Sequence, residues 1–251
     1  MNLGLGVWLN QRRRGSSTPA HPGAAVVARM TDFYVADDPE AGDQAWESRA
    51  AGGTDLQRGS TTGVDANDPT FADTILSRPA VTFASADAEY LQGSVHPTLT
   101  AASGSFSALF LVRKTANPAD TEIIIDYRSD ASNGLFLAAT PGGQVWAYFN
   151  GTGTPVSAYV GSALWDSTIR AIGISVVDGE LKAYESVAGL SAGADGTGVG
   201  TVTLGAPRIG SLSFASLLMF DGNMFAAAMM HGASMTATEF DDATDYLLTS
   251  G

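Results

Sequence analysis

From Arg78 onward the chain is a succession of short segments rich in Val, Ile, Thr and aromatic residues, separated by turn residues. In "SFSALFLVRK" (105–114) both sets of alternate residues are apolar until Arg113, which predicts a strand covered on both faces. Asp178 and Gly179 stand between "IGISVV" and "ELKAYES" and predict a hairpin, because its two-residue turn needs a positive φ at both positions. Many strands, frequent turns and almost no helix predict an all-β sandwich or barrel.

The composition fits this class and excludes several functions. Apolar residues make up 45% of the chain, which is enough for a sizeable core. The net charge of −13 makes the folded body repel phosphate backbones, so we expect it to bind no nucleic acid. The absence of cysteine excludes disulfides and thiolate chemistry, and three widely spaced histidines argue against a histidine-rich metal site.

The apolar stretch between Ile209 and Thr238 contains a single charged side chain, Asp221, and several closely spaced methionines. The turn signal at 221–223 divides this stretch into two pieces of about a dozen residues, whereas a membrane span needs roughly 20. No membrane insertion is therefore expected. We predict two late strands instead, with the methionines as adaptable core residues.

The end of the chain predicts a short helix, whereas the region from about Met30 to Ser77 is predicted to be loop-rich because it holds many turn formers. Thr236 and Glu239 have the spacing of a capping box, which marks the start of the helix. The apolar residues that follow fall on one helical face: Phe240, Ala243, Tyr246 and Leu247.

Residues 1–24 have the composition of an extended arm and its linker, ahead of a single domain at 25–251. An apolar tip comes first, then three arginines, then "GSSTPAHPG"; a secretion signal has its charges before its apolar run, so none is predicted. The tip would suit a groove of another subunit, and the arginines would suit an acidic surface such as that of a second copy. The residues predicted to dock are Trp8, Arg12, Arg13 and Arg14.

Three segments resemble the concanavalin A-like jelly roll of the laminin-G and pentraxin type. "RPAVTFASADAEYLQG" (78–93) resembles the entry strand of this family, and "SFSALFLVRK" (105–114) resembles the long strand that follows. The segment 208–251 resembles the closing block, with an Ile-Gly, a Phe-Asp-Gly turn, a final strand and a capped helix ending in Tyr-Leu. The resemblance covers roughly residues 30–251 and implies an antiparallel jelly-roll β-sandwich with a short C-terminal helix.

Members of this family include lectins, adhesion modules, glycan-active enzymes and domains of virus particle proteins, so the resemblance does not choose a function. The usual Phe-Asp-Gly of the entry strand is Phe83-Ala84-Ser85 here, and the last strand lacks the acidic residue that commonly follows its turn. These departures argue against calcium at a family-like position. No cofactor is predicted, and calcium stays open at the acidic loops 65–73 and 85–89.

Trp146, Tyr148 and Asn150 are alternate residues in "QVWAYFNG" (144–151) and therefore share one face of a predicted strand. Lectin-like sandwiches bind sugars on aromatic rings placed beside amide or carboxylate groups. These three residues are the predicted glycan-binding site. The alternative is that both faces of this strand are buried and that the rings belong to the core.

No catalytic residues are predicted. Glycosidases that retain configuration place two carboxylates about 5 Å apart. Glu122 and Asp126 are the nearest candidates, because an even spacing puts them on one strand face. Glu180 and Glu185 are an odd number apart and do not share a face. Solvated strand ends account for both pairs, and no serine stands in a nucleophile-elbow pattern near a base.

The arm, the lack of a secretion signal and the lectin-like body together predict a non-enzymatic structural protein of a bacteriophage virion, in the head decoration or in the tail or fibre. It would be made in the host cytoplasm and located in the virion. Its predicted partners are other virion proteins, copies of itself and cell-surface glycans. The first alternative is a soluble carbohydrate-binding lectin, and the second is a glycan-cleaving enzyme.

Overall fold

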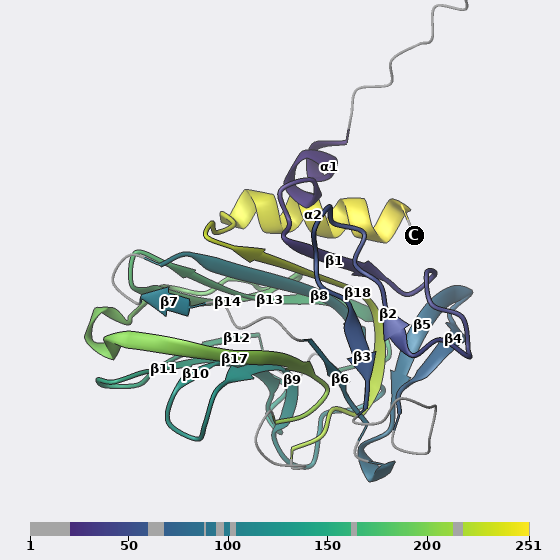
Figure 1. Cartoon of the computed structure of the whole chain (residues 1–251), viewed down its shortest axis with the longest axis horizontal. Helices are drawn as coiled ribbons and strands as arrows, with labels where there is room; N and C mark the ends of the chain where they lie inside the picture. Colours follow the sequence, from purple (N-terminus) through teal and green to yellow (C-terminus); the bar gives the residue numbers. More distant parts are fainter. Residues whose placement is uncertain are drawn as a thin grey trace, which may run out of the picture.

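The computed structural model describes residues 21–59, 68–87, 89–93, 98–100, 104–161, 165–212 and 218–250. They form two antiparallel β-sheets packed face to face, with helix α2 (Ala237–Ser250) lying across the outside of one sheet (Figure 1). The short helix α1 (Pro22–Val27) packs on the far side of α2. The predicted all-β sandwich with a C-terminal helix is confirmed.

The first sheet is the one that carries helix α2. Its strands follow one another in the order β15 (Gly189–Leu190), β14 (Glu180–Glu185), β13 (Ile169–Val177), β8 (Phe106–Arg113), β18 (Gly222–His231), β5 (Arg78–Phe83) and β4 (Thr70–Ile75). Two further strands pair beside this path: β1 (Asp32–Val35) with β18, and β16 (Ala194–Asp195) with β14.

The second sheet forms the other layer. Its strands follow in the order β12 (Val156–Val160), β11 (Val145–Asn150), β10 (Gly134–Ala139), β9 (Glu122–Arg128), β17 (Thr201–Ile209), β6 (Leu91–Gln92), β3 (Leu56–Arg58) and β2 (Ala45–Trp46). Strand β7 (Thr98–Thr100) pairs with β17, and two short 3-10 helices, η1 (Ser85–Asp87) and η2 (Thr197–Val199), lie in the connections.

Strand β8 lies at the centre of the first sheet and is buried on both faces. Phe106 and Phe110 point between the two sheets, where they join the main hydrophobic core. Leu109 and Leu111 point the other way and pack with residues of helix α2. The two-sided burial predicted for 105–114 is therefore confirmed, and its cause is the helix that covers the outer face of the sheet.

Helix α2 begins at the predicted capping box. The Thr236 backbone N–H donates to Glu239 Oε2 over 2.8 Å, and the Glu239 N–H donates to Thr236 Oγ1 over 3.3 Å. Phe240 then stacks on Tyr184 of β14, with ring centroids 4.6 Å apart. The helix can approach this closely because residue 173 is glycine, where an added Cβ would lie 2.7 Å from the Phe240 ring.

The predicted hairpin at 178–179 joins β13 to β14, with φ values of +47° at Asp178 and +82° at Gly179. The region from Met30 to Ser77 is expected to be loop-rich, and it also contains four strands that the sequence pattern does not reveal, β1, β2, β3 and β4. These strands contain two to six residues. Such short strands form because partners distant in the sequence are already in place, as Val35 pairs with Ala226 of β18.

The described residues of the apolar stretch 209–238 include one strand within the stretch, β18, rather than the two expected. Strand β17 ends at Ile209 and β18 begins at Gly222, and the described residues between them form no strand. The predicted packing of the methionines is confirmed. Met224 and Met229 lie between the sheets, whereas Met230 and Met235 lie under helix α2. No helix of the described residues is both long and apolar enough to cross a membrane.

The predicted docking arm, with Trp8, Arg12, Arg13 and Arg14, lies outside the described residues, which begin at residue 21. The predicted border between arm and domain, at residues 24 and 25, falls inside helix α1. This helix packs against α2, so the chain joins the folded body at or before Pro22.

Candidate functional site

The outer face of the second sheet carries four aromatic side chains near its β12 edge, and we call them the aromatic patch. Phe136 comes from β10, Trp146 and Tyr148 come from β11, and Tyr159 comes from β12. The register places Trp146 opposite Tyr159 and Tyr148 opposite Phe136. The residues between them along β11 point into the core, because successive side chains of a strand alternate between faces.

The four rings of the aromatic patch pack against one another along the sheet. Trp146 and Tyr159 are parallel within 5°, with centroids 5.8 Å apart, and Phe136 and Tyr148 are stacked at 4.8 Å. Tyr159 is 49% exposed, Trp146 and Tyr148 are half-buried, and Phe136 is buried. The patch therefore presents the outer parts of three rings to solvent on a base formed by the fourth.

Polar groups continue the row of side chains from the aromatic patch toward the middle of the sheet. Asp126 of β9 lies opposite Phe136, and Arg208 of β17 lies opposite Asp126. Arg128 donates from Nε to Asp126 Oδ1 over 2.9 Å, and its guanidinium lies 4.4 Å from the Phe136 ring centroid. Arg208 donates to Gln92 Oε1 over 3.0 Å. Phe136 therefore contacts the aromatic rings on one side and the guanidinium of the Arg128–Asp126 ion pair on the other.

Two of the three predicted glycan-binding residues belong to the aromatic patch. Trp146 and Tyr148 share the outer face, as their spacing predicts, and are not part of the core between the sheets. Asn150 ends β11 opposite Gly134 and is buried, so it contributes no exposed amide. Sequence reasoning missed Tyr159 and Phe136. Alternation within "PVSAYVG" and "GLFLAAT" fixes which residues share a face, but only the register shows that these rings meet Trp146 and Tyr148.

The expectation that Glu122 and Asp126 share a strand face is wrong. The register between β9 and β10 shifts, so that Ile123 pairs with Ala138 but Ile125 already pairs with Leu137. Ile124 is the extra residue of a β-bulge, and Ile124 and Ile125 both point into the core. Asp126 therefore lies on the outer face and Glu122 on the opposite side. The two carboxylates cannot converge on one substrate, as a pair of glycosidase carboxylates must.

The two acidic loops considered for calcium approach each other around a buried arginine. Arg58 donates to the backbone oxygens of Asp43 and Pro69 over 2.7 and 2.5 Å, and the charges of Asp68 and Glu89 act on it. Within the described ranges, no three His, Asp or Glu side chains are grouped so that they could hold a metal ion. Residues 65–67 of the first loop lie outside those ranges. Calcium binding stays a prediction.

Glu89 is expected to make stability depend on pH. Burial raises its pKa to about 7, against the hydrogen bond from the Ala84 N–H. The pKa of Glu89 is thus higher in the folded protein, about 7, than in the unfolded chain, about 4.5. The folded protein therefore loses stability as the pH rises between these two values, because Glu89 must then be charged in a buried position. Glu89→Gln should therefore stabilise the protein at about pH 8, by on the order of 2 kcal/mol, and have little effect at about pH 4. Chemical denaturation at the two pH values measures this; equal effects at both would contradict it.

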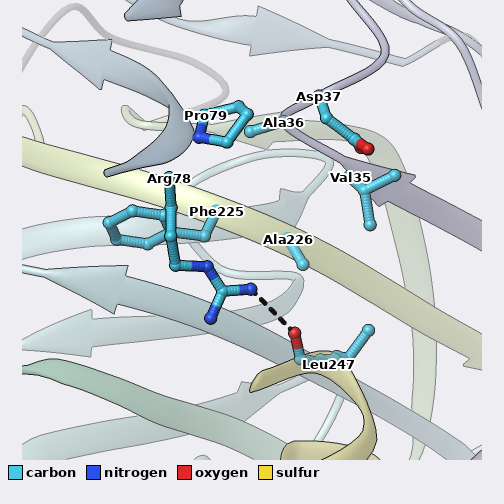
Figure 2. Close-up of a pocket in the computed structure, with 8 residues that line it drawn as sticks. All are labelled: Val35, Ala36, Asp37, Arg78, Pro79, Phe225, Ala226 and Leu247. Atoms are coloured by element: carbon cyan, nitrogen blue, oxygen red, sulfur yellow. Dashed lines mark hydrogen bonds between the residues drawn. The ribbon is translucent and has the colours of Figure 1, made fainter. Parts of the chain in front are cut away.

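A small cavity lies between strand β5, strand β18 and the end of helix α2 (Figure 2). Its volume is about 20 Å³, which is room for about one water molecule and excludes an organic ligand. Arg78 reaches across it and donates to the Leu247 backbone oxygen over 3.0 Å (Figure 2). A second N–H donates to the Leu248 oxygen, so Arg78 satisfies carbonyls at the end of the helix and complements its dipole. Its function is structural.

Fold and site together define an antiparallel β-sandwich with an exposed aromatic patch on one sheet. No protein-family model and no curated protein matches the sequence. Among solved structures, the chain is similar to the binding domain of botulinum neurotoxin serotype D, with a TM-score of 0.62 and 9% identity over 88% of this chain and 52% of that chain.

Two further structures are similar. One is the ligand-binding domain of the same serotype in complex with N-acetylneuraminic acid, with a TM-score of 0.60 and 10% identity over 89% of this chain and 52% of that chain. The other is Trypanosoma rangeli sialidase in complex with the inhibitor DANA, with a TM-score of 0.56 and 12% identity over 87% of this chain and 32% of that chain. The chain spans about half the length of the neurotoxin chains and a third of the sialidase chain. At these identities the similarity shows the fold.

Proposed function

We propose that this chain is a non-enzymatic carbohydrate-binding β-sandwich and that the aromatic patch is its binding site. The observation that carries the proposal is the cluster of exposed Tyr159 with half-buried Trp146 and Tyr148, beside the Arg128–Asp126 ion pair. Rings offer a flat apolar surface to the C–H groups of a sugar. The Asp126 carboxylate is fully buried and orients the Arg128 guanidinium, which lies beside the rings and is 10% exposed. The rings come from three adjacent strands and the ion pair from a fourth, β9, so the sheet holds them in a fixed arrangement.

The fold comparisons support the same class of ligand. A similar domain of botulinum neurotoxin has been solved with N-acetylneuraminic acid, and the other similar protein is a sialidase bound to an inhibitor. Acidic sugars therefore belong among the first ligands to test. The separation of Glu122 from Asp126 by the bulge supports binding rather than hydrolysis. The predicted location in a virion is addressed by none of these structures and stays a prediction.

A glycan array probed with the purified protein tests this proposal, with cell-surface glycans that include neutral and sialylated members. We expect binding to a restricted set of glycans, and a loss of at least about tenfold in affinity for Tyr159→Ala. Val187→Ala is the matched control, because Val187 is also an exposed apolar residue, at 69%. No binding to any glycan would contradict the proposal, as would equal affinities of the two variants.

The aromatic patch also has the character of an interface between two copies, and the same variants distinguish this outcome. Light scattering after size-exclusion chromatography measures the oligomeric state of the wild type and of Tyr159→Ala. We expect the same mass for both. A dimer that dissociates in Tyr159→Ala would assign the patch to self-association and overturn the assignment to glycans.

A further inference from the structure

A second, polar site lies at one end of the sandwich, between the end of β8, the start of β9 and the start of β18. Two adjoining hollows occupy this position, with volumes of about 380 and 490 Å³, and they share Ser85, Ala119 and Glu122 in their walls. Small-molecule sites are commonly about 300–1,000 Å³. None of the lining residues belongs to the aromatic patch, so the two sites are separate.

A buried ion pair forms the floor of this polar site. Lys114 Nζ donates to Glu122 Oε2 over 2.6 Å, and the side chains are only 5% and 14% exposed. Lys114 Nζ also donates to the Asp221 backbone oxygen, and the Asp221 N–H donates to Glu122 Oε2 over 3.0 Å. Burying two charges costs desolvation energy that their attraction barely offsets, so the pair is a poor source of stability.

A chain of hydrogen bonds forms the adjacent wall. Arg113 donates from Nη1 to Asn223 Oδ1 over 3.2 Å, and Asn223 Nδ2 donates to Thr82 Oγ1 over 2.9 Å. Arg113 also donates from Nε to the Ser167 backbone oxygen. Asn223 is 7% exposed, so these contacts hold the arginine in one orientation at the edge of the hollow.

Several polar groups of these walls are left over for a ligand. Both bonds to Glu122 use Oε2, and Oε1 makes none with any described residue. Arg113 Nη2 and the Ser85 hydroxyl likewise make no hydrogen bond within the described part of the chain. Acceptor and donor groups thus face the same space. A hydroxyl group can donate to one and accept from the other.

The charges that line this site have both signs, so they give no strong preference for a simple anion or a simple cation. Glu122 and Asp221 disfavour an anion, and Arg113 and Lys114 disfavour a cation. One wall is apolar, because Leu218 is 41% exposed there and is held in the left-handed region at a φ of +56°. A non-glycine residue in this region is strained, and such strain is concentrated at functional sites.

We infer that these two adjoining hollows bind a neutral polyhydroxylated ligand such as a sugar. Its hydroxyls bond to Glu122 Oε1, Arg113 Nη2 and Ser85, and its C–H groups contact Leu218. Binding at this site is independent of the aromatic patch, so an experiment that disproves one proposed site does not bear on the other.

NMR titrations of the ¹⁵N-labelled protein test this inference, with D-glucose, D-galactose, D-mannose and N-acetyl-D-glucosamine as separate probes. We expect at least one of them to shift the backbone amide signals of residues 115–117, 119 and 222–223, and N-acetylneuraminic acid to leave those signals unchanged because of its charge. If none of the four sugars shifts these signals, or if the anionic sugar shifts them as strongly, the inference is wrong.

Two variants in helix η1 test whether the sugar binds in the hollows, and neither variant changes the buried ion pair. Ser85 is exposed and lines both hollows, so Ser85→Phe fills them and should weaken binding by at least about tenfold. Ala86→Phe adds the same ring one residue along, outside the lining, and should keep the wild-type affinity. Trp146→Ala should also keep it. Equal binding by Ser85→Phe and wild type, or loss in Trp146→Ala, would overturn the assignment.

Discussion

Replacing Phe240 with alanine is expected to lower the free energy of unfolding by about 4 kcal/mol. The ring is fully buried between helix α2 and the first sheet, where it stacks on Tyr184 and lies over Gly173. Truncation leaves a cavity that the helix cannot close, because Leu247 and Ala243 hold it against the same sheet. Urea denaturation followed by circular dichroism measures the change.

Asp245→Ala is the matched control for this prediction, because Asp245 lies on the exposed side of the same helix. It should change the free energy of unfolding by less than about 0.5 kcal/mol. A loss below about 1 kcal/mol for Phe240→Ala would mean that helix α2 does not close the sandwich. The two-sided burial of β8 would then be wrong as well.

Replacing Trp146 with alanine is expected to weaken glycan binding more than any other single change in the aromatic patch, by about 30-fold or more. Trp146 is the central ring, since it contacts Phe136, Tyr148 and Tyr159. Its removal takes away its own contacts with the sugar and also the support of Tyr159. Isothermal titration calorimetry with the tightest-binding glycan of the array measures the loss.

Trp146→Phe separates the two effects, because phenylalanine keeps a ring next to Tyr159 but lacks the indole N–H. It should retain most of the affinity that Trp146→Ala loses. Thermal unfolding of both variants shows whether they are folded. A folded Trp146→Ala variant with wild-type affinity would exclude the patch as the binding site.

Elements with a strong local pattern could be predicted from the sequence. The hairpin at Asp178 and Gly179 depends on the positive φ of two adjacent residues, and the start of α2 depends on the Thr236–Glu239 spacing. Both are interactions between residues close in the chain. Strands β1 to β4 have no such pattern, because their pairing partners are distant, as Val35 and Ala226 show.

Only the part of the site that depends on a local pattern could be predicted from the sequence. Alternation correctly places Trp146 and Tyr148 on one face, but the rings of Phe136 and Tyr159 join them only through cross-strand register. The bulge at Ile124 reverses the parity of Glu122 and Asp126. In a run of three isoleucines nothing marks which residue is the extra one, since all three are equally apolar. Bulges of this kind are decided by packing between strands.

The indole N–H signals of the tryptophans give the most direct test of glycan binding at the aromatic patch. Trp46 and Trp165 are buried in the core between the sheets, whereas Trp146 lies on the outer face. The signal assigned to Trp146 is the one missing from the spectrum of Trp146→Phe. On titration with the best glycan of the array, we expect the Trp146 signal to shift and those of Trp46 and Trp165 to stay unchanged. Saturable binding that leaves the Trp146 signal in place would contradict the proposed site.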